Sequence, residues 1–116
     1  MNHCKQRISL LQEAIPQLSV QASYEMQQTG VLILDVRTEA EYAQQHISQA
    51  QYLGRDYLEM RIETIVPDYQ QPIILACGGG TRSLFAAESL RQLGYENVYN
   101  MAGGFRDWVG SELPTS

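Results

Sequence analysis

Two uninterrupted, mostly apolar segments dominate the hydrophobic pattern of the chain. They lie at residues 31–37 and 72–77, and both are rich in isoleucine, leucine or valine. Apolar runs of this length, without alternating polar positions, are typical of strands that are buried on both faces of a parallel sheet. Shorter apolar segments predict further strands at residues 18–20, 50–53 and 98–101.

Segments with helical spacing of apolar residues separate these strands. The spacing predicts helices at residues 3–15, 21–29, 39–45, 56–66 and 81–93, and a short one that contains Phe105 and Trp108. Thr38 and Glu41 form a capping-box sequence. Proline or glycine ends several of the helices, at Pro16, Gly30, Pro67 and Gly94. Strands that alternate with helices predict an α/β fold of three layers, α/β/α, with a mostly parallel central sheet.

Length and charge bound the possible functions. The 116 residues predict one domain, with residues 1–16 as an N-terminal helical extension and residues 17–112 as the domain itself. The net charge is −5 without a block of like charge, which argues against nucleic acid and membrane as partners. No apolar run reaches the ~18 residues of a transmembrane helix, and the first residues make a poor signal peptide. We therefore expect a cytoplasmic protein.

Cysteine and histidine are too few and too scattered to predict a metal site. The chain has two cysteines, Cys4 and Cys77, and two histidines, His3 and His46, without zinc-ligand spacing. A disulfide between these distant cysteines is not expected in a reducing compartment. The sequence thus predicts no metal and two free thiols.

The segment with the clearest chemical pattern is Cys77-Gly78-Gly79-Gly80-Thr81-Arg82-Ser83. It joins a buried strand to a helix, so we expect it at the carboxyl edge of the sheet, where open α/β sheets bind ligands. Glycines allow successive backbone N–H groups to form an anion cradle, and a helix N-terminus adds positive potential. Both features stabilise a thiolate. Arg82 adds a cation at the rim for an anionic substrate.

Each of these features has an ordinary explanation when it stands alone. A cysteine at a strand end is usually a small buried apolar residue, and a glycine-rich turn is usually only a turn. Their combination in one segment favours a reactive Cys77. Asp35 and Arg37 end the other long strand near the same edge, and we expect them to pair with each other. Arg55, Arg61 and Glu59 are expected on the solvated surface by default, and the alternative for Arg55, which follows Gly54, is that it faces the pocket.

Three motifs make the chain resemble the rhodanese family of sulfurtransferase domains over residues 17–110. The active-site loop of that family is the most specific of them, and it is similar to residues 77–83. The other matching segments are Leu34-Asp35-Val36-Arg37 with Glu41-Tyr42, and Leu93-Gly94-Tyr95 with Val98, Gly103-Gly104 and Trp108.

The resemblance implies a rhodanese-like domain that transfers a sulfane sulfur. The thiolate of Cys77 would take sulfur from a small anionic donor such as thiosulfate and form a persulfide. A thiophilic acceptor, either a thiol or a partner protein, would then remove that sulfur. No cofactor is implied. The residues expected to bind the donor and the persulfide are Gly78, Gly79, Gly80, Thr81, Arg82 and Ser83, with Asp35 and Arg37 in support.

One turn departs from the family pattern. The family commonly has Gly-His-Ile-Pro-Gly-Ala after its first helix, whereas this chain has Gln45-His46-Ile47-Ser48-Gln49-Ala50. Without these glycines and the proline, we expect the turn to use another geometry. The turn lies outside the catalytic loop, and His46 is interpreted as a structural residue rather than a general base.

Two other functions stay open. Cysteine and arginine at the ends of a loop also bind tetrahedral oxyanions in cysteine-based phosphatases and arsenate-reductase-like enzymes. Phosphatases that resemble this fold have five residues between the two, whereas four lie between Cys77 and Arg82. The shorter loop favours a single sulfur atom over an oxyanion. The third function is a non-catalytic rhodanese-like binding module, but such modules often lack the cysteine that this chain retains.

Overall fold

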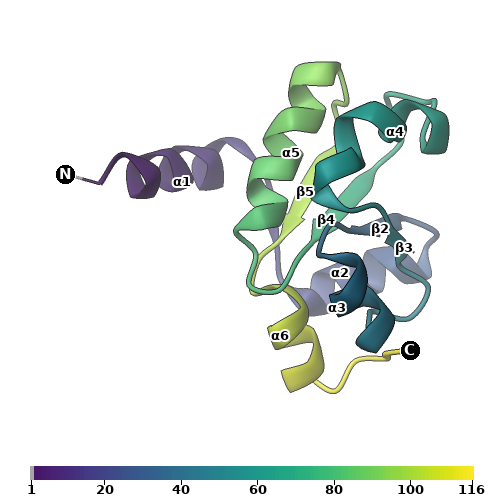
Figure 1. Cartoon of the computed structure of the whole chain (residues 1–116). Helices are drawn as coiled ribbons and strands as arrows, with labels where there is room; N and C mark the ends of the chain where they lie inside the picture. The colour runs from purple at the N-terminus through teal and green to yellow at the C-terminus, as the bar shows by residue number, and fades with distance from the viewer. Residues whose placement is uncertain (1) are drawn as a thin grey trace.

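Five strands form one sheet in the computed structural model, which describes residues 2–116. All neighbouring strands are parallel, in the order β1-β5-β4-β2-β3 (Figure 1). The predicted α/β class is therefore confirmed, and the sheet is parallel throughout. The strands are β1 (Gln17–Leu18), β2 (Leu32–Asp35), β3 (Gln51–Tyr52), β4 (Ile73–Ala76) and β5 (Val98–Met101).

Helices cover both faces of this sheet, and capping residues that the sequence analysis identified mark some of their ends. Thr38 and Glu41 form the capping box at the start of α3, and Gly94 ends α5 in the left-handed conformation. No helix within residues 2–116 has the length and apolar character to cross a membrane. The helices are α1 (His3–Ala14), α2 (Val20–Gln28), α3 (Glu39–Gln44), the 3-10 helix η1 (Arg55–Tyr57), α4 (Leu58–Ile65), α5 (Arg82–Leu93) and α6 (Gly104–Gly110).

The prediction of a strand at residues 18–20 is wrong at its end. Val20 is the first residue of α2, because Ser19 caps this helix by accepting a hydrogen bond from the backbone of Ala22 at 3.0 Å. Strand β1 therefore has only the two residues that pair with β5.

The core consists of two clusters, one on each face of the sheet. Alternate residues of β4 point to opposite faces, so Ile73 and Leu75 belong to one cluster and Ile74 to the other. The first cluster packs under α4 and α5, and α1, which projects from the domain (Figure 1), reaches it through Leu11 near its C-terminal end; the second cluster packs under α2 and α6. Burial on both faces explains why these strands are continuous apolar runs.

The carboxyl ends of β2 and β4 lie side by side. Asp35 of β2 pairs in register with Ala76, the last residue of β4, and Cys77 follows it directly. Helices α5 and α6 also begin at this edge, because α5 follows β4 and α6 follows β5 (Figure 1). This edge therefore collects the residues that the sequence singled out.

Candidate active site

Cys77 lies at the end of β4, where the chain turns into the glycine loop before α5. Its exposed fraction is 1%. The first turn of α6 holds this loop, since the backbone N–H of Phe105 donates to the carbonyl oxygen of Cys77 at 2.7 Å and that of Arg106 to Gly78 at 3.1 Å. The loop is thereby fixed against the helix that follows the last strand.

Two glycines allow this close approach of backbones. A Cβ on Gly104, whose φ is +64°, would lie 2.6 Å from the carbonyl oxygens of Cys77 and Gly78. A Cβ on Gly80, whose φ is +94°, would lie 3.1 Å from the nitrogen of Gly103. Larger residues at these positions would push the loop and α6 apart.

The sulfur of Cys77 has two polar neighbours. The backbone N–H of Gly80 donates to Sγ at 3.1 Å, and the Oγ of Ser83 lies 3.3 Å from Sγ. Ser83 is buried in the first turn of α5, whereas Thr81 is exposed and makes no side-chain cap. Gly80 and Ser83 are thus the predicted loop residues that contact the sulfur directly.

A buried polar network lies beneath Ser83, and it includes Asn100, which the sequence reasoning did not single out. Ser83 Oγ donates to Asn100 Oδ1 at 2.6 Å, and Asn100 Nδ2 donates to Gln17 Oε1 at 2.8 Å and to the carbonyl oxygen of Gly80 at 3.1 Å. Gln17 in turn donates to the carbonyl oxygen of Ile15 at 2.9 Å. The signal in the sequence was an asparagine inside the apolar run 98–101.

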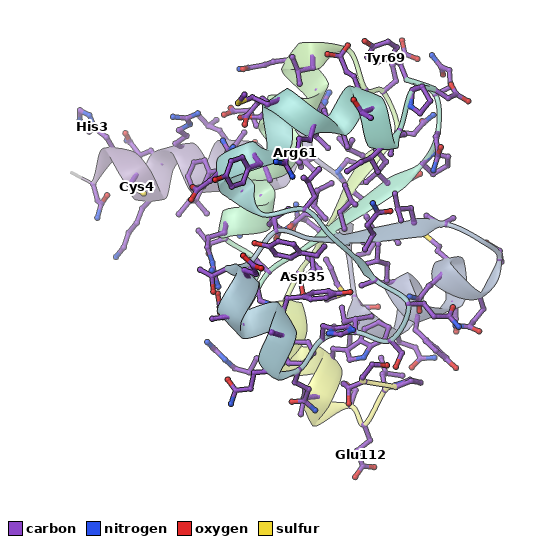
Figure 2. All side chains as sticks on the ribbon, turned by 45° about the vertical axis from the view of Figure 1, so that its right-hand side comes forward. His3, Cys4, Asp35, Arg61, Tyr69 and Glu112 are labelled. Atoms are coloured by element: carbon purple, nitrogen blue, oxygen red, sulfur yellow. The ribbon has the colours of Figure 1, made fainter. Side chains whose placement is uncertain are left out.

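Asp35 and Arg37 form a buried ion pair, as expected. Arg37 Nη2 lies 2.8 Å from Asp35 Oδ2, and the Arg37 backbone N–H donates to Asp35 Oδ1 at 3.0 Å. Arg37 also donates to the carbonyl oxygen of Gln45 at 2.7 Å, and its guanidinium lies over the ring of Phe105 at 4.3 Å. The pair therefore ties β2 to the end of α3 and to α6. Figure 2 shows Asp35 in the body of the domain, and Cys4 on α1, well away from it.

Arg82 is paired with a carboxylate. Its Nη1 and Nη2 donate to the two oxygens of Glu41, at 2.9 Å and 3.2 Å. The hydrogen bond from Arg82 is the main cause that lowers the pKa of Glu41 from 4.5 to about 2, and the same bond raises the pKa of Arg82. The expected cation at the rim is present, but Glu41 already neutralises it.

A pocket of about 370 Å³ opens beside Arg82, and it corrects one expectation. Arg55 lines this pocket instead of pointing only into solvent. It donates to Glu59 at 2.8 Å and to Ser89 of α5 at 3.2 Å. The lining residues are Val36, Arg37, Thr38, Glu39, Tyr52, Gly54, Arg55, Asp56, Tyr57 and Arg82.

The turn that departs from the family pattern has one residue in the left-handed region. Gln49, which stands where the family pattern has a glycine, has a φ of 69°, in the left-handed region that favours glycine. His46 Nδ1 lies 2.8 Å from the carbonyl oxygen of Tyr42, and the two rings stack with their centroids 3.7 Å apart. These contacts support the structural interpretation of His46.

Comparison with known proteins points to one family. Residues 19–111 match the model of the Rhodanese-like domain family. The chain is 35% identical over 98 residues to a thiosulfate sulfurtransferase, GlpE, of Haemophilus influenzae (strain PittEE), and the match covers 84% of this chain and 91% of that protein.

Solved structures show the same fold. The rhodanese-like domain of an Anabaena protein matches with a TM-score of 0.79 and 26% identity, over 87% of this chain and 78% of that one. A Rhodopseudomonas palustris protein of unknown function, described as a possible tyrosine phosphatase, matches with a TM-score of 0.89 and 23% identity, over 97% and 93% of the two chains. The second likeness concerns the fold alone.

Proposed function

Because the chain belongs to the rhodanese-like domain family, we propose that it is a sulfurtransferase that carries a sulfane sulfur as a persulfide on Cys77. The observation that carries the proposal is the environment of the sulfur. Sγ lies at the carboxyl edge of a parallel sheet, between the N–H of Gly80 and the hydroxyl of Ser83. Relatives of 30–35% identity are named thiosulfate sulfurtransferases, which supports the same chemistry.

The first half of the reaction loads the sulfur. The thiolate of Cys77 attacks the outer sulfur of thiosulfate and a new S–S bond forms. The S–S bond of the donor breaks, and sulfite leaves with its electron pair. One thiolate and one dianion give one persulfide anion and one dianion, so charge and atoms balance. No external oxidant or reductant takes part in this exchange.

The second half unloads the sulfur. An acceptor thiolate attacks the outer sulfur of the persulfide, and Cys77 leaves as a thiolate that is ready for another donor. The N–H of Gly80 points at the sulfur that carries charge at the start and end of this cycle, so it stabilises the leaving thiolate. Both the donor and the acceptor approach through the rim that Arg82 occupies.

Loop length favours sulfur transfer over phosphatase chemistry. Four residues separate Cys77 from Arg82, and both terminal nitrogens of this arginine already donate to Glu41. Arg82 is therefore not free to bind the oxygens of an aryl phosphate. A binding module without catalysis is disfavoured, because the chain retains the cysteine. Free thiols, with Cys4 exposed and Cys77 buried, suit the reducing cytoplasm in which we place the reaction.

Intact mass spectrometry after incubation with thiosulfate tests the proposal. We expect one added sulfur atom on the wild type and on Cys4→Ser, and none on Cys77→Ser. Cyanide should then remove the added sulfur and yield thiocyanate. If Cys77→Ser acquires sulfur as the wild type does, or the wild type never acquires it while hydrolysing aryl phosphates, the proposal is wrong.

A further inference from the structure

The carboxylate of Glu41 pairs with Arg82, the first residue of α5 after the glycine loop that follows Cys77. We propose that Glu41 is a specificity-determining residue, and that it biases the protein against dianionic donors and toward sulfane donors whose negative charge is balanced by a nearby ammonium group. This inference rests on the proposed sulfurtransferase function and deepens it, because it names the charge class of the preferred donor.

The first argument is the state of Arg82. An arginine beside the nucleophile would attract thiosulfate if the N–H groups of its guanidinium were free to form hydrogen bonds. Here both Nη atoms face the two oxygens of Glu41, at 2.9 Å and 3.2 Å. A dianionic donor that binds Arg82 must therefore displace the carboxylate of Glu41. Otherwise it binds beside the intact pair, where the negative charge of Glu41 repels it. By either route, a second negative charge on the sulfur donor makes its binding free energy less favourable.

The second argument is that Glu41 is held in place from its other side. The backbone N–H and the hydroxyl of Thr38 each donate to Glu41 Oε1 at 3.0 Å, and Thr38 Oγ1 accepts from the backbone of Glu41 at 3.3 Å. The capping box of α3 thus fixes this carboxylate, and its lowered pKa keeps it charged at neutral pH. Releasing Arg82 for a substrate anion would leave a fixed negative charge at the rim.

The third argument is the balance of charge around the adjoining pocket. Its three arginines are all paired with carboxylates: Arg37 with Asp35, Arg55 with Glu59, and Arg82 with Glu41. The pocket also presents Glu39 and Asp56, which have no ion-pair partner among residues 2–116. Because carboxylates neutralise the three arginines and two further carboxylates remain, this surface suits a sulfur donor that carries an ammonium group.

A charge series of donors with one reacting group tests this inference. Thiosulfate carries two negative charges, methanethiosulfonate carries one, and 2-aminoethanethiosulfonate is a zwitterion. In each, Cys77 attacks the outer sulfur, and sulfite or a sulfinate leaves with the electron pair. The rate of persulfide formation, followed by mass spectrometry, gives kcat/KM for each donor.

The matched variants are Glu41→Gln and Glu13→Gln. Glutamine still serves in a capping box, so α3 keeps its start, while the charge at the rim disappears. Glu13 is an exposed residue of α1 and provides the same charge change away from the loop. Circular dichroism establishes that both variants are folded.

We expect the wild type to load from the zwitterion faster than from thiosulfate. Glu41→Gln should raise kcat/KM about fivefold for thiosulfate and about twofold for methanethiosulfonate, while the zwitterion gains nothing, and salt should shrink these differences. Glu13→Gln should change none of them. Equal changes for all three donors, or a loss for thiosulfate, would show that Glu41 only positions Arg82 and would overturn the inference. A wild type that forms no persulfide with any donor overturns the proposed function instead.

Discussion

Replacement of Gly104 by alanine tests how closely α6 must approach the catalytic loop. The added Cβ would lie 2.6 Å from two carbonyl oxygens, those of Cys77 and Gly78, and the backbone there has a φ of +64°. Neither backbone oxygen can move aside as the end of a flexible side chain does. The loop and the helix must therefore separate by several tenths of an ångström or more.

The cost follows from two contributions. A left-handed backbone costs a non-glycine residue about 1–2 kcal/mol, and overpacking of a tight contact costs about 1–3 kcal/mol. The smaller entropy of the unfolded alanine chain offsets about 0.5–1 kcal/mol of this sum. We expect Gly104→Ala to lower the free energy of unfolding by about 1–4.5 kcal/mol, which a domain with roughly 5–15 kcal/mol of stability survives.

Gly110→Ala is the matched control, since a Cβ at this last residue of α6 meets no atom within 4 Å. Urea unfolding should show Gly110→Ala as stable as the wild type or slightly more so. Separation of the loop from α6 also strains the 2.7 Å bond between Phe105 and Cys77, so persulfide formation by Gly104→Ala should fall at least tenfold. If Gly104→Ala matches Gly110→Ala in both stability and sulfur loading, the close approach does not position the loop.

Two further predictions concern charged pairs. Asp35→Asn leaves Arg37 buried and unpaired, and should lower the free energy of unfolding in urea by about 3–5 kcal/mol, whereas Glu59→Gln at an exposed pair should cost under about 1 kcal/mol; equal costs would contradict the structural role of the buried pair. Glu41 has a folded pKa near 2, below its ordinary 4.5, so its bond to Arg82 stabilises the fold above the ordinary pKa and is lost as pH falls toward 2. Wild type should exceed Glu41→Gln by about 0.5–1 kcal/mol at pH 7, and a difference that persists at pH 2 would refute this.

The sequence predicts the central strands well, because burial on both faces of the sheet requires an uninterrupted run of apolar residues. Residues 73–76 have no polar position, so the apolar run and the strand nearly coincide. The capping box of Thr38 and Glu41 is equally local. Val20 was misplaced because a serine cap outweighed the β propensity of a single valine.

Side-chain contacts between segments that are distant along the chain have no local sequence pattern that predicts them. Glu41 and Arg82 are 41 residues apart, and nothing along the chain pairs them. Asn100 meets Ser83 only because β5 lies beside β4 and α5 begins above them. The nucleophile was therefore predictable from one segment, whereas the partners that set its surroundings depend on the topology.

The hydroxyl of Ser83 has one hydrogen and two neighbours that can receive it. Backbone carbonyls fix the amides of Gln17 and Asn100, so Asn100 Oδ1 faces Ser83 as an acceptor. While Ser83 donates its hydrogen to Asn100, its oxygen can only accept a hydrogen bond from the S–H of Cys77, and this arrangement suits the thiol form of Cys77. Once that proton has left, rotation about a single C–O bond turns the hydroxyl toward the sulfur. The buried scaffold thus accommodates both forms of the nucleophile through the motion of a single hydrogen atom.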